Sequence, residues 1–338
     1  MAAFEFGIDT FGDVTRAADG SFHPQAQVLR DVVEEAVLAD EVGLDVFGVG
    51  EHHRRDFAIS APEVILAAIA GRTKRIGLGS SVTVLSTDEP IRVFQRFSTL
   101  NAISNGRAEV ILGRGSFTES YPLFGYDLSQ YEQLFEEKLA QFAALIAPGA
   151  DKIFPPIEHG TLRTWVGVGG SPESVVRAAR YQIPLTLAII GGNPMRFKPY
   201  VDLYAQSLER LGKPMLPVAV HSPGHVAETD EQAKNELWPH YQTMINRIGA
   251  ERGWPPTSRE NFEREAGPDG ALCVGSPDTV IRKIAGTVKR LGLSRFDLKY
   301  SAGTMPHDLL MKSIELIGTK VAPQVRELVA AESSVAEA

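Results

Sequence analysis

The sequence predicts an α/β fold in which eight parallel strands alternate with helices, a (β/α)8 TIM barrel with insertions. Two observations carry this prediction. Eight short apolar, β-branched runs recur along the chain, and segments with apolar residues at helical spacing lie between them. Most of the runs are apolar throughout, as is typical of parallel strands that are covered on both faces. A doubly wound open sheet is the alternative architecture.

The predicted strands are spread over the whole 338-residue chain. They lie at residues 4–9, 45–50, 76–85, 108–112, 164–168, 185–190, 216–221 and 296–300. Eight strands are the number that closes a barrel of this kind.

The predicted helices carry apolar residues three and four positions apart, which places them on one face. Two of the helices also have a start signal, because Ser171 precedes Pro172 and Ser276 precedes Pro277, an N-cap followed by proline in the first turn. The apolar sets are Leu29, Val32, Val33, Ala36 and Val37; Phe135, Leu139, Phe142 and Ile146; Ile281, Ile284, Val288 and Leu291; and Leu310, Ile314, Ile317 and Val321.

The domain organisation follows from the absence of any break in composition. We expect residues 1–330 to form a single barrel domain and residues 331–338 to be a flexible C-terminal tail. Three connections, at about 113–130, 148–162 and 253–276, are longer than usual, and long segments in compact domains often have a function. We expect 253–276 to be a mobile insertion.

Composition excludes several classes of protein. Hydrophobic residues make up 43% and charged residues 22%, as in an ordinary globular protein, and the net charge of −8 is unsuited to nucleic-acid binding. No apolar stretch is long enough for a membrane span, and the first residues lack a secretory signal pattern. The single cysteine, Cys273, excludes an internal disulfide and a cysteine-based zinc site. We therefore expect a cytoplasmic enzyme without nucleic-acid or membrane partners.

Ionisable residues follow the second predicted strand, and in a barrel the chemistry lies at the carboxyl ends of the strands. Glu51, His52 and His53 are adjacent there, and an imidazole at this place is suited to acid–base catalysis. The alternatives are an ordinary solvated loop or a metal site. A metal site would need ligands from other strand ends, and Asp9 and His221 are the candidates.

Anion-binding features follow the fourth and fifth strands. Arg114 stands between two glycines, so its guanidinium could bind a phosphate closely, although a surface ion pair is the alternative. Gly169 and Gly170 precede Ser171 and Ser174 at a predicted helix start, where free N–H groups favour a phosphate and a plain N-cap is the alternative. The chain has no G-x-G-x-x-G dinucleotide fingerprint, P-loop or G-x-S-x-G elbow.

In these motifs and their order, the sequence resembles the bacterial luciferase family of flavin-dependent monooxygenases. The resemblance covers nearly the whole chain. The segments that carry it are Glu51-His52-His53, 79–85, 90–95, 100–107, Gly113-Arg114-Gly115, 170–174, 274–277 and the helix that follows Pro306.

The resemblance implies a (β/α)8 barrel that binds FMN, in reduced form supplied by a separate flavin reductase, and uses O2 to oxygenate a small organic substrate. It also implies a homodimer and a mobile active-site loop near 253–276. It gives His52 the role of catalytic acid or base, with Glu51 and His53 beside it. The implied cofactor-binding residues are Arg114, Gly169, Gly170, Ser171 and Ser174 at the phosphate, and Ser81 and Val82, which can be joined by a non-proline cis bond, beneath the flavin ring.

Two positions depart from the light-emitting members of that family. Gly113 stands where they carry a reactive cysteine, and Ala188-Ile189 stands where they carry a tryptophan. We therefore do not expect light emission or long-chain aldehyde chemistry. Three other functions remain open from the sequence: a deazaflavin-dependent dehydrogenase of the same superfamily, a non-catalytic flavin-binding protein, and a metal-dependent hydrolase built on residues 51–53.

Overall fold

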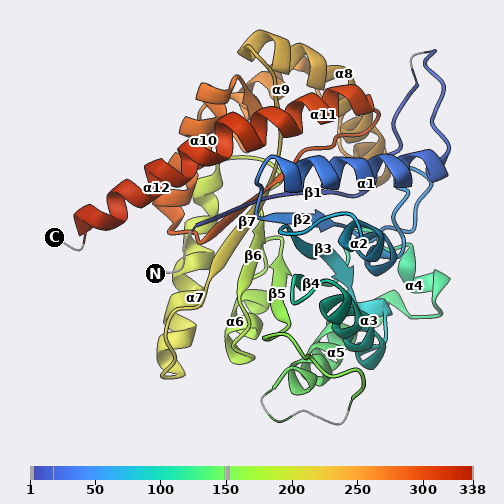
Figure 1. The fold of residues 1–338 in the computed structure, drawn as a ribbon, viewed down its shortest axis with the longest axis vertical. Helices are drawn as coiled ribbons and strands as arrows, with labels where there is room; N and C mark the ends of the chain where they lie inside the picture. The colour runs from blue at the N-terminus through green and yellow to red at the C-terminus, as the bar shows by residue number, and fades with distance from the viewer. Residues whose placement is uncertain (1–3, 18, 148, 150–152, 337–338) are drawn as a thin grey trace.

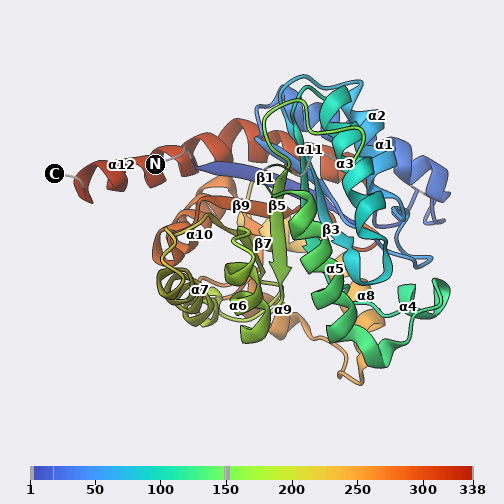
Figure 2. The same ribbon diagram turned by 90° about the horizontal axis from the view of Figure 1, so that it is seen from below.

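The chain folds into a closed parallel barrel surrounded by helices (Figures 1 and 2). The computed structural model describes residues 4–336 with the exception of 18, 148 and 150–152. Eight strands close the barrel in the order β1, β2, β3, β4, β5, β6, β7, β9, with β9 between β7 and β1. The predicted (β/α)8 barrel is therefore confirmed, and the open-sheet alternative is wrong because β6 pairs with β7 and completes the circle.

The bounds of the elements are as follows. The strands are β1 (Glu5–Thr10), β2 (Val46–Val49), β3 (Gly77–Val84), β4 (Ala108–Gly113), β5 (Arg163–Val168), β6 (Leu185–Ala188), β7 (Val218–Val226), β8 (Cys273–Gly275) and β9 (Arg295–Lys299). The helices are α1 (Gln25–Glu41), α2 (Pro62–Ala70), α3 (Pro90–Ile103), α4 (Ser120–Leu123), α5 (Tyr131–Leu145), α6 (Pro172–Arg180), α7 (Lys198–Arg210), α8 (Asp230–Arg252), α9 (Arg259–Ala266), α10 (Pro277–Leu291), α11 (His307–Leu316) and α12 (Ala322–Ala336). Short turns of helix lie at Leu85–Thr87, Leu128–Gln130, Pro194–Phe197 and Ile317–Val321.

Each of the eight predicted strands overlaps one strand of the barrel. The sequence reading missed β8, which has three residues and pairs only with the far end of β7. It lies within the segment 253–276, together with α9. So short a strand carries no periodic signal of its own. The mobility expected for 253–276 stays a prediction.

Both helices begin where the sequence predicts, but only one of the two serines makes a side-chain cap bond. Ser171 caps α6, since its Oγ accepts a hydrogen bond from the Ser174 N–H at 3.3 Å. At α10, Ser276 is also the residue before the helix, but its side chain makes no cap bond. Its own N–H instead donates to the Asp230 carboxylate at 2.6 Å, which joins the start of α10 to the start of α8.

The C-terminal helix α12 continues to Ala336, beyond the expected end of the domain. Six residues of the expected tail are thus helical, and residues 337 and 338 lie outside the described part of the chain. The flexibility of this end stays a prediction. Within the described chain, no helix combines the length and the apolar composition that a bilayer span requires.

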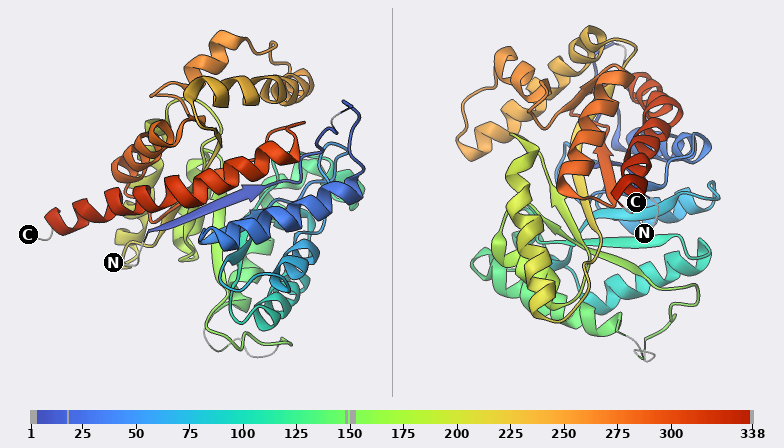
Figure 3. Two further views of the ribbon diagram at one scale, coloured as in Figure 1. Left: turned by 45° about the horizontal axis from the view of Figure 1, so that its top comes forward. Right: turned by 90° about the vertical axis from the view of Figure 1, so that its left-hand side faces the viewer.

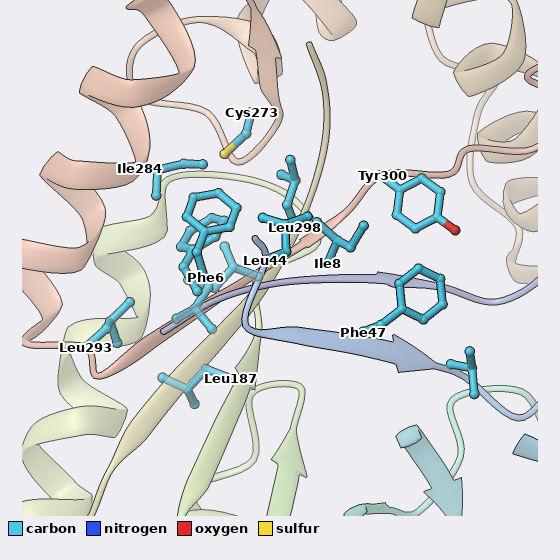
Figure 4. Close-up of a cluster of buried hydrophobic side chains, with 14 of the residues drawn as sticks. Phe6, Ile8, Leu44, Phe47, Leu187, Cys273, Ile284, Leu293, Leu298 and Tyr300 are labelled. Carbon is cyan, nitrogen blue, oxygen red and sulfur yellow. The ribbon is translucent and has the colours of Figure 1, made fainter. Parts of the chain in front are cut away.

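The hydrophobic core lies between the barrel and its helices. Alternate residues point outward, as Phe6 and Ile8 of β1, Leu298 of β9 and Tyr300 just after β9 do (Figure 4). The ring of Tyr300 packs against Phe47 of β2 with centroids 6.0 Å apart. This outward layer accounts for the continuous apolar runs of the sequence.

The interior of the barrel is charged instead. Arg295 of β9 is 2% exposed and forms an ion pair with Glu109 of β4, which lies on the opposite side of the barrel, and a second one at 2.7 Å with Asp297. Burial raises the pKa of Asp297 to about 6, against the effect of the neighbouring guanidinium.

Glycines on the strands make room for this cluster. A Cβ at Gly7 would overlap the Asp297 carboxylate, and one at Gly79 would lie 2.8 Å from Glu109 Oε1. Because inward-facing positions of neighbouring strands share one lumen, a large charged side chain needs a glycine opposite it. The glycines of the strands are therefore required by packing.

We expect Glu109→Ala to lower the free energy of unfolding by about 3 kcal/mol, since it leaves a buried guanidinium with one carboxylate fewer. Denaturant unfolding would measure the change. Glu5→Ala is the matched control, because Glu5 pairs with Arg163, a neighbour of Glu109, but at the exposed rim. It should change stability by less than about 1 kcal/mol. Equal effects of the two variants would contradict the importance of the internal pair.

Candidate functional site

The carboxyl ends of the strands meet on one side of the barrel, and His52 lies there inside an aromatic cage. Its ring stacks on Phe11 at 4.5 Å between centroids and contacts Phe57 at 4.4 Å and Phe117 at 5.3 Å. Nδ1 of His52 is buried without a hydrogen-bond partner among the described residues. Burial lowers its pKa to about 3, so the imidazole is neutral at physiological pH.

Glu51 and His53 lie on the other side of the chain from His52, as adjacent residues of an extended segment do. Nε2 of His53 is 2.8 Å from Glu51 Oε1, and the second oxygen of Glu51 accepts a hydrogen bond from the Val84 N–H, also at 2.8 Å. The Glu51 N–H donates to the Val82 carbonyl at 3.1 Å. Glu51 thus fixes the end of β3, and its carboxylate is already engaged there.

The peptide bond between Ser81 and Val82 is a non-proline cis bond, as the family resemblance implies. Two glycines of the neighbouring strand end allow side chains to gather around it. A Cβ at Gly48 would lie 2.9 Å from the Asp9 Cβ and 3.1 Å from the Ser81 Cβ, and one at Gly50 would overlap Phe11 and the Ser81 carbonyl. Asp9, Ser81 and Phe11 therefore border one small region at the mouth of the barrel.

Val82 occupies the lumen beside this region. A Cβ at Gly113 would overlap the Val82 Cγ2, and one at Gly167 would lie 3.1 Å from Cγ1. Ile111 and Trp165 complete the small apolar cluster in which Val82 packs. Glycine at position 113, where light-emitting relatives carry cysteine, is thus explained by the size of Val82.

Arg114 follows β4 and lies over the ring of Tyr131, 5.1 Å from its centroid. It forms an ion pair with Glu132, the second residue of α5. Its side chain keeps 19% of its surface exposed, so an anion has access to it.

A second arginine lies beside the first. Arg177 of α6 reaches the other oxygen of Glu132 at 3.3 Å and binds Glu136 at 2.5 Å. One of its amino groups is 3.3 Å from the Ser174 Oγ. Glu132 thus bridges the two guanidinium groups, and the carboxylates of Glu136 and Glu173 also lie at this place.

The glycines before α6 leave this region open. Gly170 has a φ of +126°, which glycine adopts readily, and its carbonyl accepts a hydrogen bond from the Tyr200 hydroxyl at 2.9 Å. A Cβ at Gly169 would meet nothing within 4 Å. Open space therefore lies beside Gly169, whereas at the start of α6 Pro172 has no N–H and the Ser174 N–H is bonded to Ser171.

Sequence reasoning missed Arg177 and Phe11. Arg177 is three residues after Ser174, one turn along the same helix face, and that spacing could have revealed it. Phe11 directly follows β1, but a single phenylalanine after a strand gives no sign of the imidazole that stacks on it.

Three connections are joined over His52 by Arg54. Its guanidinium pairs with Asp56 of its own loop, with Glu119 before α4 and with Glu251 near the end of α8, and it lies over Phe117 at 4.5 Å. Figure 3 shows α8 and α9 as a pair standing at one end of the barrel. The closed arrangement of these segments is what buries His52.

The metal alternative finds no support in this geometry. In the described part of the chain, no three histidine, cysteine or acidic side chains are grouped so as to hold a metal ion. The two residues considered as additional ligands, Asp9 and His221, bind each other at 2.7 Å.

Comparison with known proteins decides the family. The model of the luciferase-like monooxygenases matches residues 10–295. The chain belongs to this family. Its relatives include the alkanal monooxygenase alpha chain of Photorhabdus luminescens, which is 23% identical over an alignment covering 90% of this chain and 93% of the relative. Luciferase-like monooxygenases are oxidoreductases, so the expected enzyme class is confirmed.

Solved structures share the fold. Monooxygenase RslO1 from Streptomyces bottropensis superposes with a TM-score of 0.79 at 21% identity, covering 94% of this chain and 99% of that one. The oxygenating constituent of 3,6-diketocamphane monooxygenase from Pseudomonas putida, in complex with FMN, gives 0.75 at 20% identity, covering 95% and 99%. An F420-dependent secondary alcohol dehydrogenase gives 0.72 at 15% identity, covering 96% and 99%. The luciferase-like fold therefore occurs with two different cofactors.

The neutral His52 has a consequence for stability. An unfolded histidine takes up a proton near pH 6.5, whereas folded His52 does so only near pH 3, so lowering the pH through this range favours the unfolded chain. In the wild type, this effect lowers the free energy of unfolding by up to about 1.4 kcal/mol for each unit by which the pH falls. We expect the His52→Asn variant to lack this decrease. Denaturation at pH 7, 6 and 5 would measure it.

His307 gives a control of opposite sign. Its hydrogen bond to Glu35 raises its pKa, so it stabilises the fold at low pH and loses this effect as the pH rises through the folded pKa. His307→Asn should therefore make the loss of stability toward acid steeper. If the stability of the His52→Asn variant had the same pH dependence as that of the wild type, it would contradict the conclusion that the aromatic cage keeps His52 neutral.

The contact between Val82 and position 113 is also testable. We expect Gly113→Cys to lower the free energy of unfolding by about 2 kcal/mol through overpacking, and Val82→Ala in the same chain to restore most of it. Gly169→Cys is the control, since that site has open space. Strictly additive effects of the two substitutions would show that the side chains do not compete for one volume.

Proposed function

We propose that this chain is an FMN-dependent monooxygenase that uses reduced FMN and O2 to oxygenate a small organic substrate. The single observation that carries the choice of cofactor is the pair of arginines at the start of α6. Arg114 and Arg177 share Glu132, and Arg177 lies one turn after Ser174 at the start of α6. Two guanidinium groups and a helix N-terminus suit the double negative charge of a terminal phosphate.

The rest of the mouth fits a flavin ring. The cis segment Ser81–Val82 lies at the end of β3, next to β4, which carries Arg114. Gly48 and Gly50 let Asp9, Ser81 and the aromatic ring of Phe11 come together near that segment, where Phe11 offers an aromatic face to a flat ligand. Two buried polar atoms there, Nδ1 of His52 and Oδ1 of Asp9, have no partner in the described chain and are available to a ligand.

When bound, reduced FMN supplies the two electrons that activate O2. The protein's residues bind, orient and exclude water. Arg114, Arg177, Ser171 and Ser174 hold the phosphate, and Glu51 fixes the segment beneath the ring through the Val84 N–H. His52, neutral in its cage, offers a hydrogen bond to the reacting groups, and the segments joined by Arg54 keep bulk water out.

We further propose a separate flavin reductase as the source of reduced FMN, a homodimer as the assembly and the cytoplasm as the location. The resemblance supports the first two. Large apolar side chains are exposed on the neighbouring helices α2 and α3, at Val64 and Ile103, and such surfaces often mark interfaces.

The deciding experiment is an anaerobic titration of the protein with reduced FMN and, in parallel, with reduced deazaflavin F420, followed by addition of O2 and candidate substrates. We expect saturable binding of reduced FMN and substrate-dependent uptake of O2. Preference for F420 with no O2 uptake would instead favour a dehydrogenase, as in the F420-dependent structure of the same fold.

We expect Arg114→Ala and Arg177→Ala each to weaken FMN binding about 30-fold, which corresponds to the loss of one charged hydrogen bond of about 2 kcal/mol. The free energy of unfolding should change far less. Arg180→Ala is the matched control on the same helix, because Arg180 pairs only with the far oxygen of Glu136 and is exposed. Fluorescence titration with FMN measures all three. Unchanged affinity in both Arg114→Ala and Arg177→Ala would remove the phosphate assignment.

A further inference from the structure

Asp9 and His221 form a buried pair that the proposed mechanism does not use. Asp9 is on β1 and His221 on β7, and β9 lies between these strands, so the two side chains meet inside the barrel. Oδ2 of Asp9 is 2.7 Å from Nδ1 of His221, and both residues are less than one-tenth exposed. In the described chain, Nε2 of His221 makes no hydrogen bond with another residue. An imidazole held through one nitrogen by a carboxylate presents its other nitrogen for proton transfer.

The pair lies in the region assigned to the flavin. Asp9 and Ser81 flank Gly48, each within about 3 Å of the place where a Cβ of that glycine would lie. The ring of His221 is parallel to Phe11, at 6.0 Å between centroids and with 10° between planes, and Phe11 stacks on His52. Phe11 therefore separates two imidazoles that border the same mouth.

The two imidazoles differ in their surroundings. His52 lies among aromatic rings with its Nδ1 unpartnered in the described chain, and its low pKa keeps it neutral. Nδ1 of His221 contacts the Asp9 carboxylate at 2.7 Å. Of the two rings, the one paired with Asp9 is therefore held in place by a carboxylate.

We propose that His221, positioned by Asp9, is the residue that delivers a proton at the flavin site. The inference rests on the proposed function. Reduced flavin in its anionic form, O2, one proton and an organic substrate give oxidised flavin, oxygenated substrate and water. Without substrate, the same flavin, O2 and one proton give oxidised flavin and hydrogen peroxide. In both cases the flavin loses two electrons to O2 and one proton is consumed; in the oxygenation the organic substrate gives O2 two further electrons as it accepts one oxygen atom. His221 supplies that proton from Nε2 and recovers it from water.

Few charged groups face His221. On β9, Asp297 pairs in register with His221, and Lys299 follows two residues later, with its ammonium 4.5 Å from the centre of the Phe11 ring. Lys299 is engaged with Asp13 at 2.9 Å. On β1 the group is Asp9, and β6 (Leu185–Ala188) contributes no ionisable side chain. Asp297 is itself paired with Arg295 at 2.7 Å, so Asp9 is the carboxylate that directly contacts the His221 ring.

The first test determines which ring nitrogen of His221 carries the proton in protein without cofactor. Flavin-free protein with ¹⁵N-labelled histidine should show His221 protonated on Nδ1 at high pH, and Asp9→Asn should shift the population toward the Nε2–H form. Addition of oxidised FMN should move the His221 signal. A His221 that stays in the Nε2–H form in wild-type protein, or that does not respond to FMN which binds, overturns the inference.

The second test follows reoxidation of bound reduced FMN by O2 in a stopped-flow instrument from pH 5 to 9. We expect His221→Asn to slow this reaction about 100-fold and to remove its dependence on a group titrating in this range, with FMN affinity within about threefold of wild type. Asp9→Asn, which preserves volume, should give an intermediate loss and serves if His221→Asn does not fold. Wild-type rates and pH dependence in a folded variant that binds FMN overturn the role of His221 while the proposed function stands.

His307→Asn is the matched control. His307 is likewise held through Nδ1 by a buried carboxylate, that of Glu35 at 2.8 Å, but it lies at the start of α11, outside the barrel. It should leave reoxidation unchanged. If wild-type protein binds no reduced FMN, the proposed function itself is wrong, and the role of His221 falls with it.

Discussion

The barrel is organised around a guanidinium that has no access to water. Arg295 spans the lumen to Glu109 and also holds Asp297, so the strands β9 and β4 are tied together across the interior. A charge in this place is tolerated only with its carboxylates in contact, and each of these carboxylates needs space on the neighbouring strand. Gly7 and Gly79 provide that space. The glycine pattern inside the barrel is therefore a consequence of its charges.

Glycines make room for neighbouring side chains at the mouth of the barrel as well. Gly48 and Gly50 allow Asp9, Ser81 and Phe11 to approach one another, and Gly113 and Gly167 make room for Val82. The shape of the site therefore depends on these glycines as much as on the side chains that line it. Its two halves differ in electrostatic character: two arginines paired with carboxylates lie at the proposed phosphate end, whereas aromatic rings enclose an uncharged imidazole at the other.

The sequence predicted the barrel and most of the site because these depend on local patterns. Apolar runs identify strands that are covered on both faces, and a Ser-Pro pair identified the start of α6. What it did not predict depends on contacts between distant segments. Residues 9 and 221 were both noticed as polar residues near strand ends, but only the order of strands brings them together as a pair. The network around Arg54 likewise joins positions up to 197 residues apart, and no periodicity reveals it.

Glu132 would compete with any anion that binds at the proposed phosphate site. Its carboxylate already satisfies both Arg114 and Arg177, and it is exposed enough to swing away. An incoming anion must displace it, and a departing anion is replaced by it at once. Such a group lowers the free-energy difference between the anion-bound and the anion-free site. It therefore shortens the time for which the anion stays bound and favours its exchange. Such a competing carboxylate suits a protein that binds its ligand from solution and releases it after each cycle.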